Sequence, residues 1–166
     1  MTEVRVARWS SDDLELLRQL NSHDVREHTG GPETDEEVAA RHERYLAGPG
    51  PRSGHMYTVV LPGGEKVGSV GFWERDWRGE QVYEMGWAIL PAYQGRGLAT
   101  AAVRVVIAEA ATRGDRCAAH AYPSVDNPAS NAVCRKAGFT LLGETEFEYP
   151  PGHRMRSNDW RVDLTG

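Results

Sequence analysis

The feature that most constrains the fold is the stretch of residues 82–114, where an apolar run, a glycine turn and a helical pattern follow one another. Residues 82–90 form a largely apolar run that is bounded by Pro91, and they predict a buried strand. Residues 97–113 repeat small and aliphatic side chains at helical spacing. Two glycines between them let the backbone approach a ligand, and the N–H groups at a helix start lack intrahelical partners. This order predicts an anion cradle that suits a pyrophosphate.

The residues after the glycines narrow the kind of pyrophosphate site. A P-loop requires a Lys-Ser/Thr pair after its second glycine, and here Leu98 and Ala99 follow. A dinucleotide fingerprint requires a third glycine, and Thr100 is at that position. The fingerprint also requires an acidic residue at the end of a second strand about twenty residues later, and this sequence has none there. The pattern that remains over residues 94–99 is Q-x-x-G-x-A.

This pattern closely resembles the coenzyme A loop of the GNAT superfamily of N-acetyltransferases. Residues 127–139 resemble the N-x-x-S...K-x-G-F segment of the same family. The two motifs occur in the family's order, with a helix and a strand between them. The resemblance is strong over the second half of the chain. Over the first half, only the pattern of expected elements is similar. The branch that the chain most resembles is the RimJ/RimL-like group, which acetylates ribosomal proteins and small amines.

The length and the composition predict one domain over residues 1–166. The chain has 166 residues, of which 40% are hydrophobic and 26% are charged, as in ordinary soluble domains. The expected order is β-α-α-β-β-β-α-β-α-β-β, an α/β fold of the α+β type: a mixed sheet with helices on both faces, as in the GNAT acyl-CoA N-acyltransferase fold. We interpret residues 74–81 as a turn, and we expect the central strand to splay just before Pro91, which has no N–H for a ladder.

Charge and cysteine content limit the partners. The net charge of −5 argues against nucleic-acid binding, and no apolar run approaches the roughly twenty residues that span a bilayer. No secretion signal opens the chain, so we expect reduced thiols and a cytoplasmic protein. The histidines show no ligand spacing, and two separated cysteines cannot supply a zinc cluster, so we expect no metal site. The sequence leaves open whether the chain forms a homodimer.

The resemblance implies acetyl-CoA as co-substrate. The cradle and the helix dipole would hold its pyrophosphate, and a backbone N–H just before Pro91 would face the thioester carbonyl. Asn127 is the predicted N-cap of the next helix and, by resemblance, a polar contact to the pantetheine. The predicted cofactor-binding residues are Ile89, Leu90, Gln94, Gly95, Arg96, Gly97, Leu98, Ala99, Thr100, Asn127 and Ser130.

Two carboxylates are candidates for the base that frees the amine. A lysine-like amine has a pKa of about 10.4 and a protein N-terminus one of about 8, so a strong base matters less for an N-terminus. Glu84 lies in the central strand, where a charge is costly unless it faces a cleft; a salt-bridged strand residue is the alternative. Glu148 lies near the end of the next-to-last strand, where the RimL-like pattern carries an acidic residue; a solvated strand end is the alternative. Glu84 is our first choice.

The proton for the leaving thiolate needs a donor. Many family members have a tyrosine seven residues after the motif asparagine, and here that residue is Cys134, which we interpret as a small buried hydrophobe. Ser130, on the same helix face as Asn127, is the substitute that the RimL-like pattern implies. The alternative is a first-turn serine that bonds the backbone.

These features predict an N-acetyltransferase that moves the acetyl group of acetyl-CoA to a primary amine by direct attack. The acceptor is either a protein N-terminus or a small amine such as an aminoglycoside or polyamine. By resemblance, residues 21–32 help to select it; a solvated connector is the alternative. The rival function is a weakly active or inactive acyl-CoA-binding sensor, which the missing tyrosine favours and Glu84 and Ser130 oppose.

Overall fold

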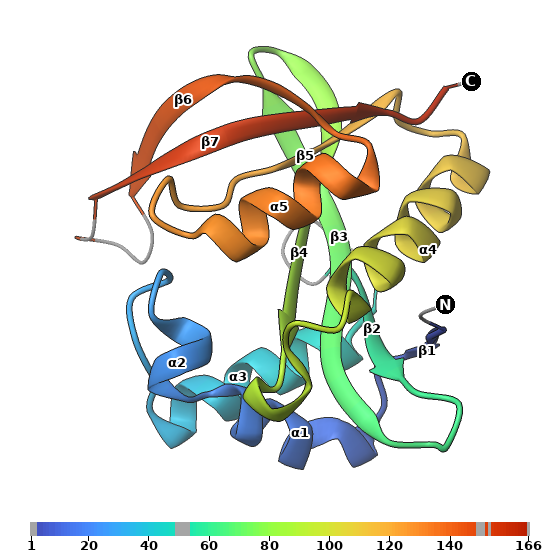
Figure 1. The fold of residues 1–166 in the computed structure, drawn as a ribbon, viewed down its shortest axis with the longest axis vertical. Coiled ribbons are helices and arrows are strands. Elements are labelled where there is room, and N and C mark those ends of the chain that lie inside the picture. The colour runs from blue at the N-terminus through green and yellow to red at the C-terminus, as the bar shows by residue number, and fades with distance from the viewer. Residues whose placement is uncertain (1–2, 49–53, 149–151, 153, 166) are drawn as a thin grey trace.

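The fold is a mixed α/β structure built on one seven-stranded sheet. The computed structural model describes residues 3–48, 54–148, 152 and 154–165, without the side chains of residues 147 and 148. The sheet has the order β1-β2-β3-β4-β5-β7-β6 (Figure 1). The strands are β1 (Arg5–Arg8), β2 (His55–Val60), β3 (Lys66–Trp77), β4 (Glu80–Ile89), β5 (Ala118–Ala121), β6 (Thr140–Glu148) and β7 (Arg154–Asp163). This architecture confirms the predicted fold class.

The described helices are η1 (Ser11–Asp13), α1 (Leu14–Leu20), α2 (His23–Arg26), α3 (Asp35–Leu46), η2 (Pro91–Tyr93), α4 (Leu98–Arg113) and α5 (Pro128–Ala137). Capping residues mark the starts of helices α3 and α5, as predicted. Thr34 and Glu37 form a capping box at α3, and Asn127 caps α5. The short helix α2 was not predicted. It begins because the Ser22 side chain accepts a hydrogen bond from the N–H of Val25.

The predicted turn over residues 74–81 is wrong. Strand β3 continues to Trp77 and pairs there with Glu80, so that β3 and β4 form a long hairpin. The two residues between them, Arg78 and Gly79, have φ values of 52° and 83°, as a two-residue hairpin turn requires. The polar composition misled the prediction, because in this part of β3 the exposed Glu74 and Asp76 alternate with half-buried residues, one of which is the charged Arg75.

The central strand splays, but at a different place from the one predicted. Strand β4 pairs with β3 along its whole length. Among the residues that the structure describes, it pairs with β5 at two positions alone, Tyr83 with Ala119 and Glu84 with His120. The gap therefore opens after Glu84 rather than just before Pro91, because β5 is only four residues long. Pro91 instead ends the strand.

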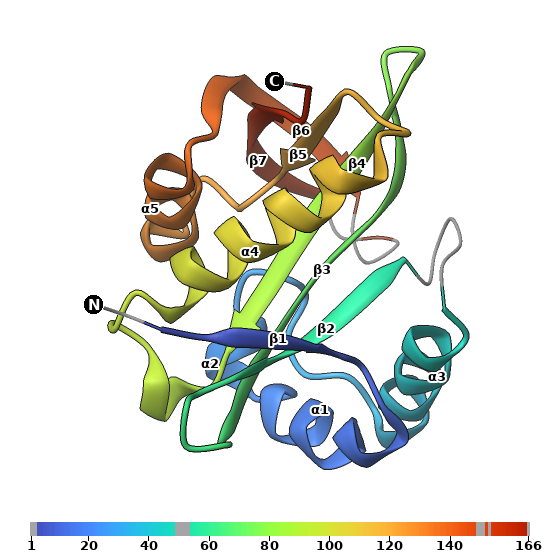
Figure 2. The same cartoon turned by 90° about the vertical axis from the view of Figure 1, so that its right-hand side faces the viewer.

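Each face of the sheet carries its own core. Helix α4 packs on one face, over Tyr83, Met85 and Ile89 of β4. Helices α1 and α3 cover the other face, where Trp73 and Ala88 pack against them. Figure 2 shows α4 and α3 on opposite sides of strands β2 and β3. Alternate residues of β4 therefore point into two different environments.

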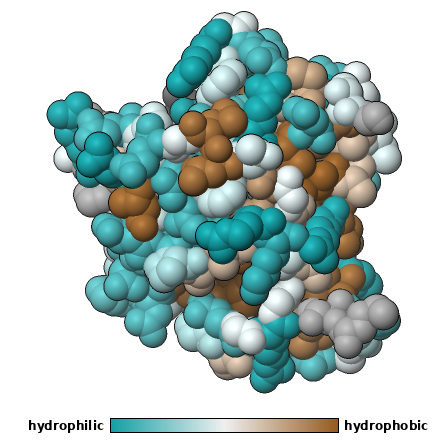
Figure 3. Space-filling view, turned by 45° about the horizontal axis from the view of Figure 1, so that its top comes forward, coloured by the Kyte–Doolittle hydropathy of each residue, from teal (hydrophilic) through white to brown (hydrophobic). Residues whose placement is uncertain are grey.

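The end of the molecule that carries β6 is mainly hydrophilic. Seen from this end, hydrophobic patches lie among hydrophilic residues (Figure 3). On the edge strand β6, Leu141 and Leu142 expose 49% and 47% of their surface. Over the described part of the chain, none of the helices combines the length and the apolar character that a membrane span requires.

Candidate active site

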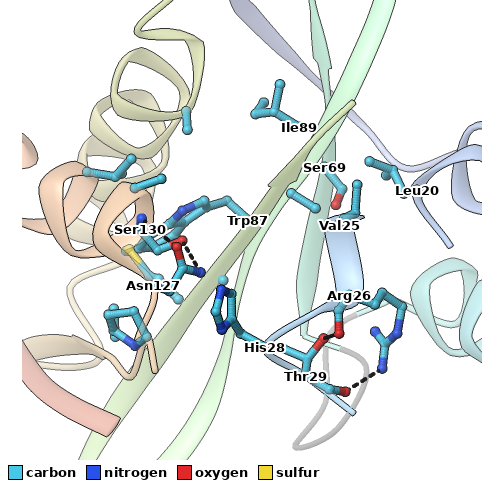
Figure 4. Close-up of a pocket in the computed structure, with 18 of the residues that line it drawn as sticks. Leu20, Val25, Arg26, His28, Thr29, Ser69, Trp87, Ile89, Asn127 and Ser130 are labelled. Carbon is cyan, nitrogen blue, oxygen red and sulfur yellow. Dashed lines mark hydrogen bonds between the residues drawn. The ribbon is translucent and has the colours of Figure 1, made fainter. Parts of the chain in front are cut away.

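A cavity of about 1240 Å³ lies where β4 and β5 part. Its walls come from α1 and α2, from β3 and β4, from the glycine turn before α4, and from the start of α5. Figure 4 shows Asn127, Ser130 and Trp87 on one side of β4, and Leu20, Val25 and Ser69 on the other. The cavity therefore joins the glycine turn to the face of the sheet that α1 and α3 cover.

The glycine turn has the local geometry of an anion cradle. Gly95 and Gly97 have φ values of 79° and 78°, in the left-handed region that favours glycine. The Leu98 side chain is buried in the core and anchors the first turn of α4. The N–H groups of that turn, which include those of Ala99 and Thr100, have no acceptor within the helix. The predicted strand, turn and helix are confirmed, and pyrophosphate binding stays a prediction.

Gln94 and Arg96 make contacts within the turn. The Gln94 side-chain amide donates a hydrogen bond of 2.9 Å to the carbonyl oxygen of Ile89, which ties the turn to the end of β4. The Arg96 guanidinium lies over the ring of Tyr93, 5.3 Å from its centre, and the residue is exposed. Gln94 therefore shapes the cradle, whereas Arg96 lies at its open side.

The two residues before Pro91 differ in their backbone groups. The N–H of Leu90 donates to the carbonyl oxygen of Val67 at 2.8 Å, so it is engaged in the ladder with β3. Pairing alternates along antiparallel strands, so the N–H groups of Ile89 and Trp87 point away from β3, into the gap beside β5. Leu90 is thus a poor candidate for the thioester donor. The N–H of Ile89 stays the predicted donor, and its geometry is shared by the N–H of Trp87.

Glu84 lies at the point where the gap opens, and it is bound to two residues of β3. Its carboxylate accepts a hydrogen bond of 2.8 Å from the Arg75 guanidinium and another from the Trp73 side chain. Burial raises the pKa of Glu84, and both partners oppose this rise without cancelling it. Glu84 lines the cavity. The two interpretations offered for it, a salt-bridged residue and one that faces a cleft, hold together.

Asn127 and Ser130 form a compact pair at the start of α5. The Asn127 side-chain oxygen accepts a hydrogen bond from the Ser130 N–H at 3.1 Å, as predicted for an N-cap. Its amide group also donates to the Ser130 hydroxyl at 3.2 Å (Figure 4). Both residues line the cavity. The Ser130 hydroxyl is therefore held at the cavity wall by a side chain rather than by the backbone.

Cys134 and Glu148 were the other two residues considered for proton transfer, and Cys134 is not among the described residues that line the cavity. The Cys134 thiol is fully buried, and burial raises its pKa to about 12, as expected of a small hydrophobe. Glu148 is the last residue of β6 and is paired with Arg154, but its side chain lies outside the described residues. Its role as a base stays a prediction.

Sequence reasoning missed Arg75 and Tyr122. The Arg75 guanidinium lies 4.5 Å from the centre of the Tyr122 ring, and both side chains line the cavity. Burial raises the pKa of Tyr122 to about 12, so its hydroxyl keeps its proton. The signal was the alternation of Trp73, Arg75 and Trp77, which was lost when this segment was assigned to a turn.

A buried pair of side chains lies beside this site. The Nδ1 atom of His120 lies 2.6 Å from the Asp159 carboxylate, whose other oxygen accepts a hydrogen bond from Trp77. His120 is fully buried between the rings of Trp77 and Tyr122. The described residues contain no group of three or more histidine, cysteine or acidic side chains that is arranged to hold a metal ion.

Comparison with known proteins identifies related domains and folds. A family model described as an acetyltransferase (GNAT) domain matches residues 3–140. A comparison with curated proteins finds no match. A GNAT-family acetyltransferase from Bacillus anthracis has a TM-score of 0.81 at 21% identity, over 99% of this chain and 97% of that one.

Two further solved structures contain coenzyme A. Spermidine N-acetyltransferase from Vibrio cholerae, in complex with CoA and spermine, has a TM-score of 0.78 at 14% identity, over 97% of this chain and 95% of that one. RimL, a ribosomal-protein alpha-N-acetyltransferase in complex with coenzyme A, has a TM-score of 0.78 at 21% identity, over 98% of this chain and 95% of that one. At such identities these structures establish a shared fold.

Proposed function

Because the chain belongs to the acetyltransferase (GNAT) domain family and is an acetyl-CoA-dependent acyltransferase, we propose that it acetylates a primary amine by direct attack on the thioester. Within the family we place it in the RimJ/RimL-like branch. The observation that carries the proposal is the parting of β4 from β5 at Glu84, in a cavity that the glycine turn also lines. One cavity thereby joins a cradle for the cofactor to a carboxylate that can act on the acceptor.

We orient the cofactor in the cavity from the glycine turn toward the gap beside β4. We place the pyrophosphate at the first turn of α4, where N–H groups and the helix dipole favour an anion. The pantetheine arm then runs along the open edge of β4, with Asn127 as a polar partner across the gap. In this position the thioester carbonyl accepts a hydrogen bond from the N–H of Ile89 or Trp87. One such donor contributes about 3–4 kcal/mol to a transition state that carries an oxyanion.

Proton transfers and bond changes complete the reaction. Glu84 removes the proton of the ammonium group, directly or through a water, and the free amine attacks the carbonyl carbon. The new C–N bond forms, and the C–S bond breaks as the oxyanion collapses. The Ser130 hydroxyl passes its proton to the thiolate, and the proton that the acylated nitrogen then loses restores the hydroxyl, so one proton remains on Glu84. Direct attack is favoured over an acyl-enzyme, because the thiol of Cys134 is buried and its raised pKa keeps it protonated.

The second candidate is a sensor that binds acyl-CoA with little or no turnover. The buried Cys134 at the position of the family's tyrosine favours it. Both candidates require acetyl-CoA binding, so they differ in turnover alone.

Two measurements test the proposal. At about 100 times its dissociation constant, acetyl-CoA should stabilise the protein by about 2.7 kcal/mol, which raises the melting temperature by roughly 5–10 °C. No shift at millimolar acetyl-CoA would remove the cofactor assignment. Thiol release is then measured over a panel of amines, including peptides with free Ala or Ser N-termini. Stabilisation without thiol release from any amine would favour the sensor.

A further inference from the structure

One end of the cavity is apolar. Leu17 and Leu20 of α1, Val25 of α2, Met56 of β2 and Ala88 of β4 line it, and the two leucines and Met56 are almost fully buried. Figure 4 shows Leu20, Val25 and Ser69 on the side of β4 opposite Asn127 and Ser130. This end is separated by β4 from the polar pair at α5. It is the part of the cavity in which we place the acceptor.

The described carboxylates in the interior of the cavity are already bound by arginines. The Glu33 carboxylate accepts hydrogen bonds of 2.9 and 2.6 Å from Arg41, and that bonding lowers the pKa of Glu33 and keeps it ionised. Arg75 holds Glu84 at 2.8 Å. Glu33 and Glu84 therefore offer little charge to an additional cation.

The other described carboxylates of the cavity lie toward solvent. The Glu74 carboxylate lies 3.2 Å from the guanidinium of Arg116 and is 45% exposed. The side chains of Asp24 and Glu27 on the α2 segment are 82% and 57% exposed, each next to a histidine. The negative charge left over thus lies at the rim and not beside Leu20 and Val25.

This distribution of charge selects among amines. The attacking amine gives up its proton to become a nucleophile, so it needs no permanent counter-charge. A second ammonium group in the same molecule keeps its charge, and an unpaired charge among apolar side chains is strongly disfavoured. An apolar group in the same position instead gains from contact with Leu20, Val25 and Ala88.

We infer that the acceptor is an amine with one positive charge and a compact apolar group near it, and that polyamines and aminoglycosides are poor acceptors. Resting on the proposed function, this inference adds the chemical class of the substrate. An amino acid amide or peptide N-terminus with an apolar first side chain belongs to the favoured class.

The test compares two acceptors that differ by one group. Norleucinamide and lysinamide have the same chain and the same α-amine, but a terminal methyl group in the first is replaced by an aminomethyl group, charged at pH 7, in the second. With acetyl-CoA saturating, we expect kcat/KM for norleucinamide to exceed that for lysinamide by about 10-fold or more. Butylamine and putrescine form a second pair and should rank in the same order. Equal or faster turnover of lysinamide or putrescine would overturn the inference and leave the proposed function intact.

A matched pair of variants locates the selection in the cavity. Val25→Glu introduces a carboxylate at the apolar end, and Val25→Gln introduces the same shape without the charge. The ratio of kcat/KM for lysinamide to that for norleucinamide should be about 10-fold higher in Val25→Glu than in Val25→Gln. An unchanged ratio in two variants that melt like the wild type would contradict this placement. Absence of thiol release from all amines would reject the proposed function itself, and the inference with it.

Discussion

The Arg75 guanidinium donates a hydrogen bond of 2.8 Å to the Glu84 carboxylate, across neighbouring strands and at the point where β4 loses its second partner. This pair sets the charge of the proposed base. Burial raises the pKa of Glu84, whereas the positive charge of Arg75 lowers it and so limits the rise. The pH dependence of acetyl transfer should therefore report on both residues.

Substitution of Glu84 should change the pH profile of kcat/KM. A carboxyl group with a raised pKa is protonated, and useless as a base, up to a higher pH than an ordinary one. The acidic limb of the wild-type profile should therefore lie above about pH 4.3, the ordinary value for glutamate. Glu84→Gln should lose this limb and reduce kcat/KM by about 10²-fold or more. An unchanged profile in a folded Glu84→Gln variant would exclude Glu84 as the base.

Substitution of Arg75 should move the same limb in a predictable direction. Arg75→Met removes the cation that lowers the pKa of Glu84, so the acidic limb should shift to higher pH. Arg75→Lys keeps a positive charge and serves as the control, with a smaller shift. A shift to lower pH in Arg75→Met would mean that the titrating group is not Glu84.

The glycine turn should affect cofactor binding separately from stability. Gly97 and Gly114 flank α4 with similar left-handed φ values of 78° and 67°. Alanine at either position should reduce stability by about 1–2 kcal/mol through backbone strain. Gly97→Ala should in addition weaken acetyl-CoA binding by roughly 10-fold, measured by calorimetry, because the cradle lies at that end of α4. Equal affinity in the two variants would place the pyrophosphate elsewhere.

Ser130 should affect proton transfer rather than cofactor affinity. Ser130→Ala removes the hydroxyl that Asn127 holds at the cavity wall, while the cap bond to the Ser130 backbone N–H remains available. We expect kcat to fall by about 10²-fold, with a change in its basic limb and with little change in the dissociation constant of acetyl-CoA. If kcat and its pH profile match those of the wild type, Ser130 is not the proton donor.

Asp13 should contribute to stability in a pH-dependent way. Burial alone would raise the pKa of Asp13. Hydrogen bonds from Lys66, Ser10 and Thr58 lower it by more than burial raises it, so the net pKa lies below 3.8. The stabilisation is thus complete above about pH 4 and is lost as the pH falls through the lowered pKa. Asp13→Ala should cost about 2–3 kcal/mol in urea unfolding at pH 7.

The neighbouring residue provides the control for Asp13. Asp12 is exposed, and Asp12→Ala should change the free energy of unfolding far less. The difference between wild type and Asp13→Ala should shrink below pH 4. A difference that stays constant down to pH 2 would show that shape, not charge, accounts for the loss.

Much of the fold could be predicted because local chemistry sets it. The caps at Thr34 and Asn127, and the glycine that ends α5, each act within a few residues. The β3–β4 hairpin was misjudged because its strands are polar where they project beyond the main cores. Its stability depends on contacts that are distant in sequence, such as the hydrogen bond from Trp77 to Asp159.

The site was predictable in its backbone parts and less so in its side chains. The residues of the glycine turn follow one another in the chain, and Asn127 and Ser130 lie three residues apart, so each of these two motifs specifies its own local arrangement. The partners of Glu84 are set by the register of two strands, which pairs Trp73 with Glu84. The engagement of Leu90 by Val67 depends on that same register. Sequence spacing does not reveal which N–H groups a ladder leaves free.

The two pairs that join β4 to β5 also determine how force passes through the molecule. Strands β1–β4 form one fully paired group and β5–β7 another, and their ladders meet at Tyr83 with Ala119 and at Glu84 with His120. A sheet joined over so short a length resists bending there less than a continuous one. Side-chain contacts such as the hydrogen bond from Trp77 to Asp159 also link the two groups, and a molecule seated in the opening, in contact with β4 and with α5, adds a further connection. Occupancy of the cavity and mechanical rigidity of the sheet are therefore coupled.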